Sequence, residues 1–299
     1  MNGIVLLDKG EGFTSQAAVT RVKHLFGAKK AGHTGTLDPM ATGLLPILLD
    51  GATRAGEFLL SSEKHYEATL RLGITTDTED VTGRVLTESD KIPAEEEVFA
   101  VLDEFRGEIM QTPPMYSALK VGGKKLVDLA RVGTVVERTP RPITVYELSA
   151  APLTKTDYRL SVRCSKGTYI RTLCADIGAR LGSGGAMATL RRVTAGGFDL
   201  SLAHTLEEFS AMTEEERRAC VLPVERIFDR VPGVKLSAFY ANLAHHGCPI
   251  SLCKIGKSFP VGQTVTLWDE GGFFAVAETV AENPQLPGTG PALKPIRQF

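Results

Sequence analysis

One segment of the sequence combines three glycines with a single carboxylate. Residues 32–43 read Gly-His-Thr-Gly-Thr-Leu-Asp-Pro-Met-Ala-Thr-Gly. The glycines permit tight turns and a close approach of the backbone to a ligand, and Pro39 restricts Asp38 to an extended conformation. An Asp-Pro pair in a loop is commonly no more than a turn former. Because the segment offers little to a core, we interpret it as a loop that presents the Asp38 carboxylate, which when ionised suits a nucleophile or a base.

A second segment places an arginine where its charge is disfavoured. Residues 164–173 read Cys-Ser-Lys-Gly-Thr-Tyr-Ile-Arg-Thr-Leu, and Arg171 falls in the first turn of a predicted helix. A cation in that position opposes the helix dipole by roughly a few tenths of a kcal/mol. Arg171 is therefore expected to have an anionic partner from another part of the chain. The alternative is an ordinary surface arginine, and the residues alone leave both interpretations open.

A third segment is strongly basic. Pro-Pro-Met-Tyr-Ser-Ala-Leu-Lys at 113–120 leads into residues 120–141, whose local charge is +4. The charged residues of this stretch are Lys120, Lys124, Lys125, Asp128, Arg131, Glu137, Arg138 and Arg141. Such a run is usually a solvated face of a helix. The alternative is an arm that contacts phosphates, because each Lys or Arg placed on a phosphate releases a counterion.

Motifs for nucleotide cofactors and metals are absent or incomplete in the sequence. Residues 10–12, Gly-Glu-Gly, lie between a predicted strand and helix but lack the third glycine and the acidic residue of a dinucleotide fingerprint. Walker A, Gly-x-Ser-x-Gly and His-Glu-x-x-His motifs do not occur. His245, His246, Cys248 and Cys253 could ligate zinc, but a structural site usually spaces two ligand pairs across a longer loop. We therefore predict buried thiols there, and neither a metal nor a cofactor.

The elements that must position these groups follow from the spacing of apolar residues. The sequence predicts a strand at 3–7, a helix from Thr14 or Ser15 to Gly27, an alternating strand at 65–72, a helix from Pro93, an alternating strand at 158–164 and a helix at 170–181 that ends at Gly182. In the second of these strands Tyr66 faces the same way as the core residues. Strands and helices mix without a regular βαβ period, which indicates an α+β fold.

Length and composition limit the class of protein. The 299 residues suggest about two domains at the usual ~150 residues each. With 34 Lys+Arg against 35 Asp+Glu, the net charge is −1, which by itself argues against a nucleic-acid partner. We expect no signal peptide, no apolar run approaches the ~20 residues of a membrane span, and five irregularly spaced cysteines do not suggest disulfides. A cytoplasmic protein is therefore expected.

A domain boundary is expected near Val231-Pro232-Gly233. Beyond it the chain consists of short strands and Gly/Pro turns, including apolar runs at 264–268 and 273–277. The sequence thus predicts a first domain of residues 1–232 and a small β-rich domain of residues 233–299.

Together, the three segments closely resemble the TruB-type bacterial tRNA pseudouridine synthase family. The most specific blocks are Gly-His-Thr-Gly-Thr-Leu-Asp-Pro-x-Ala-Thr-Gly at 32–43 and Cys-Ser-Lys-Gly-Thr-Tyr-Ile-Arg at 164–171. Shorter matching pieces keep the family's order over residues 1 to about 200: Leu-Leu-Asp-Lys at 6–9, Lys-His-Tyr-Glu at 64–67, Leu-Gly-Ile-Thr-Thr-Asp-Thr at 72–78, residues 113–120 and Leu-Arg-Arg at 190–192. The resemblance implies a mixed sheet core flanked by helices, a thumb-like insertion at about 113–143, and a PUA-like RNA-binding domain at 233–299.

The resemblance also implies an activity, the isomerisation of uridine 55 in the T-loop of tRNA. The N1–C1′ bond breaks, the uracil turns, and C5 bonds to C1′, with no cofactor or metal. The expected partner is the T-arm of tRNA, and the protein is expected to be a monomer. The alternative is a non-catalytic tRNA-binding chaperone on the same fold, against which the retained active-site residues argue.

By this resemblance Asp38 is the catalytic aspartate, Arg171 is its paired arginine, and Tyr66 is an active-site tyrosine. The Tyr66 ring can stack on the uracil, and its hydroxyl helps to remove the C5 proton. The arginine is expected to lower the pKa of Asp38, which would be ionised at pH 7. Substrate-binding roles are implied for His33, Lys64, Lys120, Lys124, Arg131, Tyr169 and Leu190, with His33 filling the gap left by the flipped base.

The resemblance also changes the meaning of the net charge, which becomes a cancellation of unlike regions. Cations cluster at 29–30, 120–141 and 191–192, beside the expected RNA path, whereas acidic runs at 95–97 and 214–216 lie on helices elsewhere. A chain with so little net attraction should bind non-specific RNA weakly and depend on the shape of its target loop.

Overall fold

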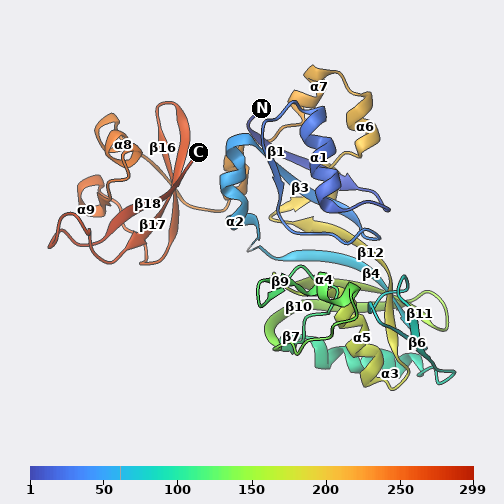
Figure 1. Cartoon of the computed structure of the whole chain (residues 1–299). Helices are drawn as coiled ribbons and strands as arrows, with labels where there is room; N and C mark the ends of the chain where they lie inside the picture. Colours follow the sequence, from blue (N-terminus) through green and yellow to red (C-terminus); the bar gives the residue numbers. More distant parts are fainter. Residues whose placement is uncertain (61) are drawn as a thin grey trace.

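A large mixed sheet and a smaller second sheet organise the computed structural model, which describes residues 1–60 and 62–299 (Figure 1). The strands of the large sheet are β1 (Gly3–Lys9), β2 (Ala31–His33), β3 (Thr42–Leu49), β4 (Lys64–Leu72), β7 (Gly107–Gln111), β10 (Arg141–Pro152), β11 (Asp157–Cys164), β12 (Gly185–Ala195) and β13 (Phe198–Asp199). Two hairpins lie outside it, β5 (Ile74–Thr76) with β6 (Val85–Glu88) and β8 (Lys120–Val121) with β9 (Lys124–Lys125). The α+β fold is thereby confirmed.

The helices are mostly short. They are α1 (Ser15–Leu25), α2 (Gly56–Leu60), α3 (Glu95–Val101), α4 (Leu126–Arg131), α5 (Ile170–Arg180), α6 (Leu206–Ala211), α7 (Glu214–Ala219), α8 (Ala238–His245) and α9 (Leu252–Ile255). Short 3₁₀ turns follow β3, α3 and β13 and precede β14 (Gly233–Lys235). Across the described ranges, no helix combines the length and apolar character needed to cross a membrane.

The large sheet runs in the order β1-β3-β12-β4-β11-β10-β7, with β2 on β3 and β13 on β12. Its neighbouring strands are antiparallel except for β3 and β12, which pair in parallel at only Arg191↔Thr42 and Arg192↔Gly43. At Gly43, φ is +99°, and a Cβ would lie 2.3 Å from the Arg192 carbonyl oxygen. Glycine is therefore required where the two halves of the sheet meet, at the end of the loop that carries Asp38.

Local sequence signals account for the elements beside that loop. Thr14 caps α1 by accepting a hydrogen bond from the Ala17 amide, and the helix ends before Gly27, whose φ is +59°. Strand β4 alternates as predicted, since Tyr66 and the other even-numbered side chains are buried while the odd-numbered ones are half-buried or exposed. Helix α5 follows Tyr169 and ends at Arg180, just before Leu181 and Gly182.

The main core lies on one face of the large sheet, under α1, α3 and α5. It joins the apolar face of α1 to the inward side chains of β4 and β11 and to Leu173 and Ile177 of α5. A second cluster covers the opposite face of β1 and β3 with residues of α2 and the turn before it. The outward face of β4 and β11 carries polar side chains, such as the ion pair of Arg71 with Asp157.

The second sheet is formed by the C-terminal part of the chain, in the order β14-β16-β17-β18-β15. Its further strands are β15 (Ile250–Ser251), β16 (Thr264–Asp269), β17 (Gly272–Val280) and β18 (Ala292–Gln298), with α8 and α9 beside them. In Figure 1 this sheet lies to one side of the large sheet, next to α2. Arg297 of β18 forms an ion pair with Glu57 of α2 at 2.6 Å, which joins the two parts.

Candidate active site

The long-range ion pair between Asp38 and Arg171 forms the centre of the site. The Arg171 Nε lies 3.0 Å from Asp38 Oδ2, and its Nη2 donates to Asp38 Oδ1 at 3.4 Å. The arginine is buried, with 7% of its side chain exposed, whereas 34% of the Asp38 side chain is exposed. The anionic partner expected for a cation in the first turn of α5 is therefore Asp38. The guanidinium contacts both carboxylate oxygens and sets the carboxylate plane.

Each of the three nitrogens of the Arg171 guanidinium has a partner. Its Nη1 lies 3.5 Å from Asp80 Oδ2 and donates to the Thr78 carbonyl oxygen at 3.2 Å, while Nη2 donates to the Tyr116 carbonyl oxygen at 2.8 Å. Asp80 is 4% exposed. It was not identified from the sequence, where the only signal is its place in the polar Thr-Asp-Thr-Glu-Asp turn. Arg171 thus lies between two carboxylates and is braced by two separate loops.

The loop that carries Asp38 is held from beneath by Lys9. This side chain is fully buried, and its Nζ donates to the carbonyl oxygens of Gly10, Asp38, Pro39 and Ala41 at 2.7–3.3 Å. A buried ammonium bonded only to backbone carbonyls fixes those carbonyls without competing for the Asp38 carboxylate. The sequence predicted no role for Lys9.

Ser15 fixes the same loop from the start of α1. Its hydroxyl donates to the Leu37 carbonyl oxygen at 2.9 Å and accepts from the Leu37 amide at 2.8 Å. Of the two cap candidates, Thr14 caps the helix and Ser15 binds the loop. The backbone on both sides of Asp38 is therefore hydrogen-bonded, and the carboxylate is presented from a rigid support.

The direction of the Asp38 pKa corrects the sequence prediction. Burial raises the pKa of Asp38 above its ordinary value, and the Asp80 carboxylate adds to this, whereas Arg171 and Lys9 act in the opposite direction. The arginine was correctly expected to lower the pKa, but loss of hydration outweighs it. The physical reason is that burial removes hydration from the ionised carboxylate, while Arg171 is shared with Asp80.

Tyr66 lies on β4 directly opposite Arg192 of β12, and both side chains are buried. Burial raises the pKa of the Tyr66 phenol, while the Arg192 guanidinium on the neighbouring strand acts to lower that pKa. Arg192 also affects His33, whose pKa is lowered by burial and by this cation. The His33 Nδ1 accepts a hydrogen bond from the Gly35 amide at 3.3 Å, so the ring folds back onto its own loop.

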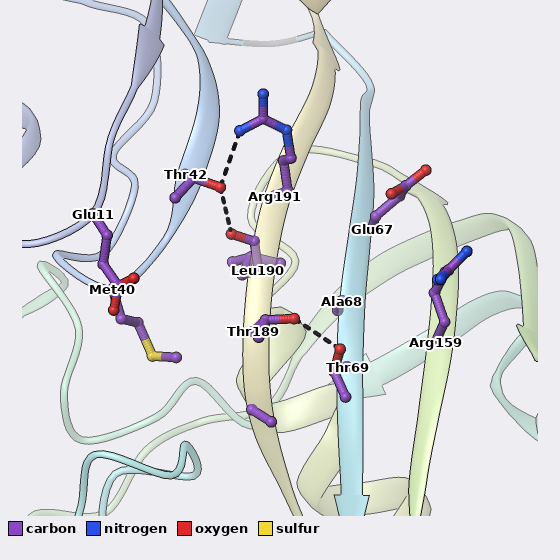
Figure 2. A pocket seen from close by; sticks show the side chains of 11 residues that line it. Glu11, Met40, Thr42, Glu67, Ala68, Thr69, Arg159, Thr189, Leu190 and Arg191 are labelled. Carbon is purple, nitrogen blue, oxygen red and sulfur yellow. Dashed lines mark hydrogen bonds between the residues drawn. The ribbon is translucent and has the colours of Figure 1, made fainter. Parts of the chain in front are cut away.

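A pocket of about 330 Å³ lies between the end of the Asp38 loop and the outward face of β4 and β12, and its lining does not include Asp38, Tyr66 or Arg171 (Figure 2). Met40 and Thr42, at the end of the Asp38 loop, form one wall, and Leu190 of β12 with Thr69 of β4 forms the other. Thr42 Oγ1 accepts from Arg191 Nη1 at 3.2 Å and donates to the Leu190 carbonyl oxygen at 3.5 Å, which closes the pocket at one end. Leu190 is thus the predicted substrate residue that lines this opening.

The remaining predicted substrate residues lie in three different settings. Tyr169 immediately precedes α5, and its backbone amide and carbonyl are both bonded to the buried Gln111 of β7. Lys64 is 7% exposed, and its Nζ donates to the carbonyls of Ser62 and Leu60, so its amine faces the backbone. Burial lowers the pKa of Lys64 to about 8.

The thumb-like segment carries the other three predicted cations on its surface. Lys120, Lys124 and Arg131 are exposed, on β8, β9 and α4 respectively. The basic run is therefore a hairpin followed by a short helix and not one solvated helical face. Its base, through the Tyr116 carbonyl, touches Arg171, so the exposed cations lie on the segment that adjoins the Asp38–Arg171 pair.

The four candidate zinc ligands do not converge. His245 Nε2 pairs with Asp269 Oδ2 at 2.8 Å, and His246 Nδ1 donates to the Asn242 carbonyl oxygen of its own helix. Cys253 Sγ contacts the Thr289 carbonyl oxygen. In residues 1–60 and 62–299, no three His, Cys, Asp or Glu side chains are grouped to hold a metal ion.

The four carbonyl contacts of Lys9 predict a specific pH dependence. Burial lowers the pKa of Lys9 to about 8, so above that pH the ammonium becomes a neutral amine with one donor fewer. We expect kcat of the wild-type protein to fall above pH 8 with little change in KM, and Lys9→Met to have a lower kcat without this descending limb. Ionisation of the uracil would give a limb in both proteins.

The stability of the fold should increase over the pH range in which kcat falls. Between pH 8 and 10.5 the unfolded chain keeps the Lys9 proton longer than the folded chain, so the free energy of unfolding of the wild type should rise with pH. Denaturant titrations at pH 7.5 and 9.5 therefore separate a loosened loop from global unfolding. A descending limb retained in Lys9→Met would contradict the role of this side chain.

The chain is similar over most of its length to a family of RNA-modifying proteins. The N-terminal domain model of the TruB family pseudouridylate synthases matches residues 23–170. The model of the tRNA pseudouridylate synthase B C-terminal domain matches residues 171–229.

Individual relatives agree with these matches. The tRNA pseudouridine synthase B of Stutzerimonas stutzeri (strain A1501) is 43% identical over 290 residues, covering 96% of this chain and 94% of the relative. That of Burkholderia mallei (strain NCTC 10247) is 46% identical over 255 residues, covering 85% of this chain and 84% of the relative. A chain in a crystal structure of a Cbf5-Nop10-Gar1 complex superposes with a TM-score of 0.74 at 26% identity, covering 99% of this chain and 84% of that one.

Proposed function

Because the chain belongs to the TruB family of pseudouridylate synthases, we propose that it isomerises uridine 55 in the T-loop of tRNA to pseudouridine. The observation that supports this most directly is the pair of Asp38 with Arg171, which brings residues 133 positions apart to 3.0 Å. A partly exposed carboxylate on a rigid loop can reach a nucleoside extruded from its stack.

Within this function Asp38 is the nucleophile or base that acts on the reacting nucleoside. Arg171 orients its carboxylate and balances its charge, while Asp80 holds Arg171 in place. Tyr66 is the group that stacks on the uracil and receives the C5 proton. His33, Tyr169 and Leu190 contact the T-loop, and Lys64 supports the floor of the site through the backbone.

The activity is tested with tRNA that carries tritium at C5 of its uridines. Isomerisation exchanges the C5 hydrogen for the sugar carbon, so the wild-type protein should release tritium to water from the T-loop position and leave the RNA unbroken. The alternative, a tRNA chaperone without catalysis, predicts binding and refolding of the RNA with no release. A wild-type protein that binds tRNA but releases no tritium would refute the proposed isomerase.

The thumb cations provide a separate prediction for RNA binding. Replacing both Lys124 and Arg131 with Ala should weaken tRNA binding and flatten its salt dependence by about one unit of slope for each phosphate that is no longer neutralised. A matched control removes two cations far from the thumb, Lys155 and Arg218, and should leave the slope as in the wild type. The measurement is the tRNA dissociation constant over a series of salt concentrations, and an unchanged slope in the thumb variant would place these cations in solvent.

We further propose two domains, residues 1–232 for catalysis and residues 233–299 as a PUA-like unit that holds the tRNA outside the T-arm. The separate hydrophobic cluster of the second sheet supports this division. Because it acts on tRNA, the protein is expected in the cytoplasm. Because Asp38 and Arg171 come from one chain, it is expected to work as a monomer. Sedimentation of the protein with and without tRNA tests the oligomeric state.

A further inference from the structure

Arg192 is a buried cation that the proposed reaction does not yet use. It is 1% exposed, and no carboxylate pairs with it among the residues that the structure describes. Its Nε donates to the Leu44 carbonyl oxygen at 2.7 Å and its Nη2 to the Gly35 carbonyl oxygen at 3.1 Å. Burial of a charge without an ionic partner is unfavourable, and a well-packed apolar side chain of similar size is often neutral or better for stability. The charge itself therefore requires an explanation.

The position of Arg192 relates it to both ends of the catalytic loop. Gly35 precedes Asp38 and Leu44 follows it, so one guanidinium ties together the two ends of the loop that presents the carboxylate. At Gly35, φ is +129°, and a Cβ would lie 3.4 Å from Arg192 Nη1. The guanidinium is thus packed directly beneath the loop and has little freedom to move.

The remaining neighbour of this guanidinium is Tyr66. The two residues are direct cross-strand partners in β4 and β12, so their side chains share one face of the sheet. The positive charge of Arg192 favours a negative charge on the phenol, whereas Asp38 and the Cys164 thiol disfavour one there. Lys64, two residues along β4, directs its amine to the carbonyls of Ser62 and Leu60 instead. Arg192 is the cation placed to act on the phenolic oxygen.

We infer that Arg192 is a positioning residue, an inference that rests on the proposed isomerase activity. Arg192 holds the Tyr66 hydroxyl toward C5 and stabilises the Tyr66 oxygen while that oxygen accepts the C5 proton. Once C5 is bonded to C1′, it still carries its hydrogen. The neutral phenol of Tyr66 first gives its proton to water, which the neighbouring Arg192 cation favours. The phenolate oxygen then takes the C5 hydrogen as a proton, and the C–H electron pair restores the C5–C6 double bond. N1 takes up a proton from water and Tyr66 is again a neutral phenol, so the sum is an isomerisation.

The reaction has two stages, and each depends on a different pair of residues. Cleavage of the N1–C1′ bond depends on Asp38 and its partner Arg171, whereas removal of the C5 proton depends on Tyr66 and Arg192. A preorganised cation next to the atom where charge develops acts most strongly in a site that excludes water. Loss of Arg192 should therefore slow the second stage more than the first.

The test is the kinetic isotope effect with tRNA that carries deuterium at C5 of uridine. In Arg192→Lys, a compact ammonium cannot reach two carbonyls and a phenol together, so kcat should fall by about 10²-fold and the isotope effect on kcat should rise above that of the wild type. Tyr66→Phe should raise it in the same way. The double variant should lose little more than either single variant, because both changes act on one step. Arg71→Lys, on the outward face of β4, is the control and should behave as the wild type.

Several outcomes would overturn the inference. A fall in kcat for Arg192→Lys with an unchanged isotope effect would assign Arg192 to folding of the loop alone, as would losses that multiply in the double variant. Thermal unfolding of each variant shows whether it is folded. If Arg192→Lys is misfolded, the isotope effects of Arg192→Gln and Tyr66→Phe test the role of Arg192 instead. An unchanged isotope effect in folded Tyr66→Phe also refutes the inference. Absence of C5 hydrogen release from the wild type is a different result, which rejects the isomerase itself.

Discussion

Asp38→Asn is expected to abolish turnover of tRNA, with kcat lower by about 10⁴-fold, because a neutral amide can neither attack the nucleoside nor accept a proton. The substitution keeps the shape of the side chain and an oxygen that can still accept from Arg171, so the loop held by Lys9 and Ser15 should stay folded. The measurement is tritium release from C5-labelled tRNA under single-turnover conditions, together with the tRNA dissociation constant, which should change little.

The control for this variant is a second aspartate that pairs with an arginine. Asp157 forms an ion pair with Arg71 at 2.7 Å on the outward face of the sheet, and Asp157→Asn should release tritium as the wild type does. Turnover by Asp38→Asn within tenfold of the wild type would show that another group attacks the nucleoside. In that case the fold would be unaffected, but Asp38 could no longer be assigned as the group that acts on the nucleoside.

The raised pKa of Asp38 adds an acid limb to the activity. Burial, the largest cause, makes the neutral acid more stable than in free aspartate. Since the reaction needs the carboxylate, kcat should fall as the pH decreases through this raised pKa, and activity should be retained above it. Replacing Asp80 with Asn removes a neighbouring negative charge that raises the pKa, so the limb should move to lower pH in that variant.

Arg171→Lys is expected to reduce kcat by about 10²–10⁴-fold, through the loss of two charge-assisted hydrogen bonds worth about 1.5–3 kcal/mol each. The guanidinium reaches Asp38, Asp80 and two backbone carbonyls at once. An ammonium has no planar fork and a shorter reach. It can balance the charge of Asp38 but cannot also hold the loops that end at Thr78 and Tyr116. The carboxylate should then lose its orientation.

The control for Arg171→Lys is a second arginine of helix α5. Arg180 of α5 pairs with Glu104 at 2.7 Å and is largely exposed, and exposed ion pairs contribute little to stability. Arg180→Lys should therefore match the wild type in turnover and in the free energy of unfolding. Near-normal kcat for a folded Arg171→Lys would mean that charge alone suffices at this position.

The local sequence determined the elements that carry the site. The start and end of α1, the alternation of β4 with Tyr66 inward, and the helix after Tyr169 were predicted because caps, glycines and a two-residue period act over a few neighbouring residues. The motif around Asp38 was identified for the same reason, since its glycines and proline restrict the backbone where they stand. The anionic partner of Arg171 was predicted to exist, although its identity came from family resemblance.

Only the tertiary structure decided which distant groups surround these residues. Lys9 under the Asp38 loop, Asp80 behind Arg171 and Arg192 opposite Tyr66 are separated from their partners by 29 to 126 positions, and no local spacing brings them together. The direction of the Asp38 pKa was decided there as well, because desolvation depends on what packs over a carboxylate and not on its neighbours in the chain. The sequence, with the family resemblance, thus identified Asp38, Tyr66 and Arg171, whereas long-range packing brought Lys9, Asp80 and Arg192 to them and determined how these groups are charged and held.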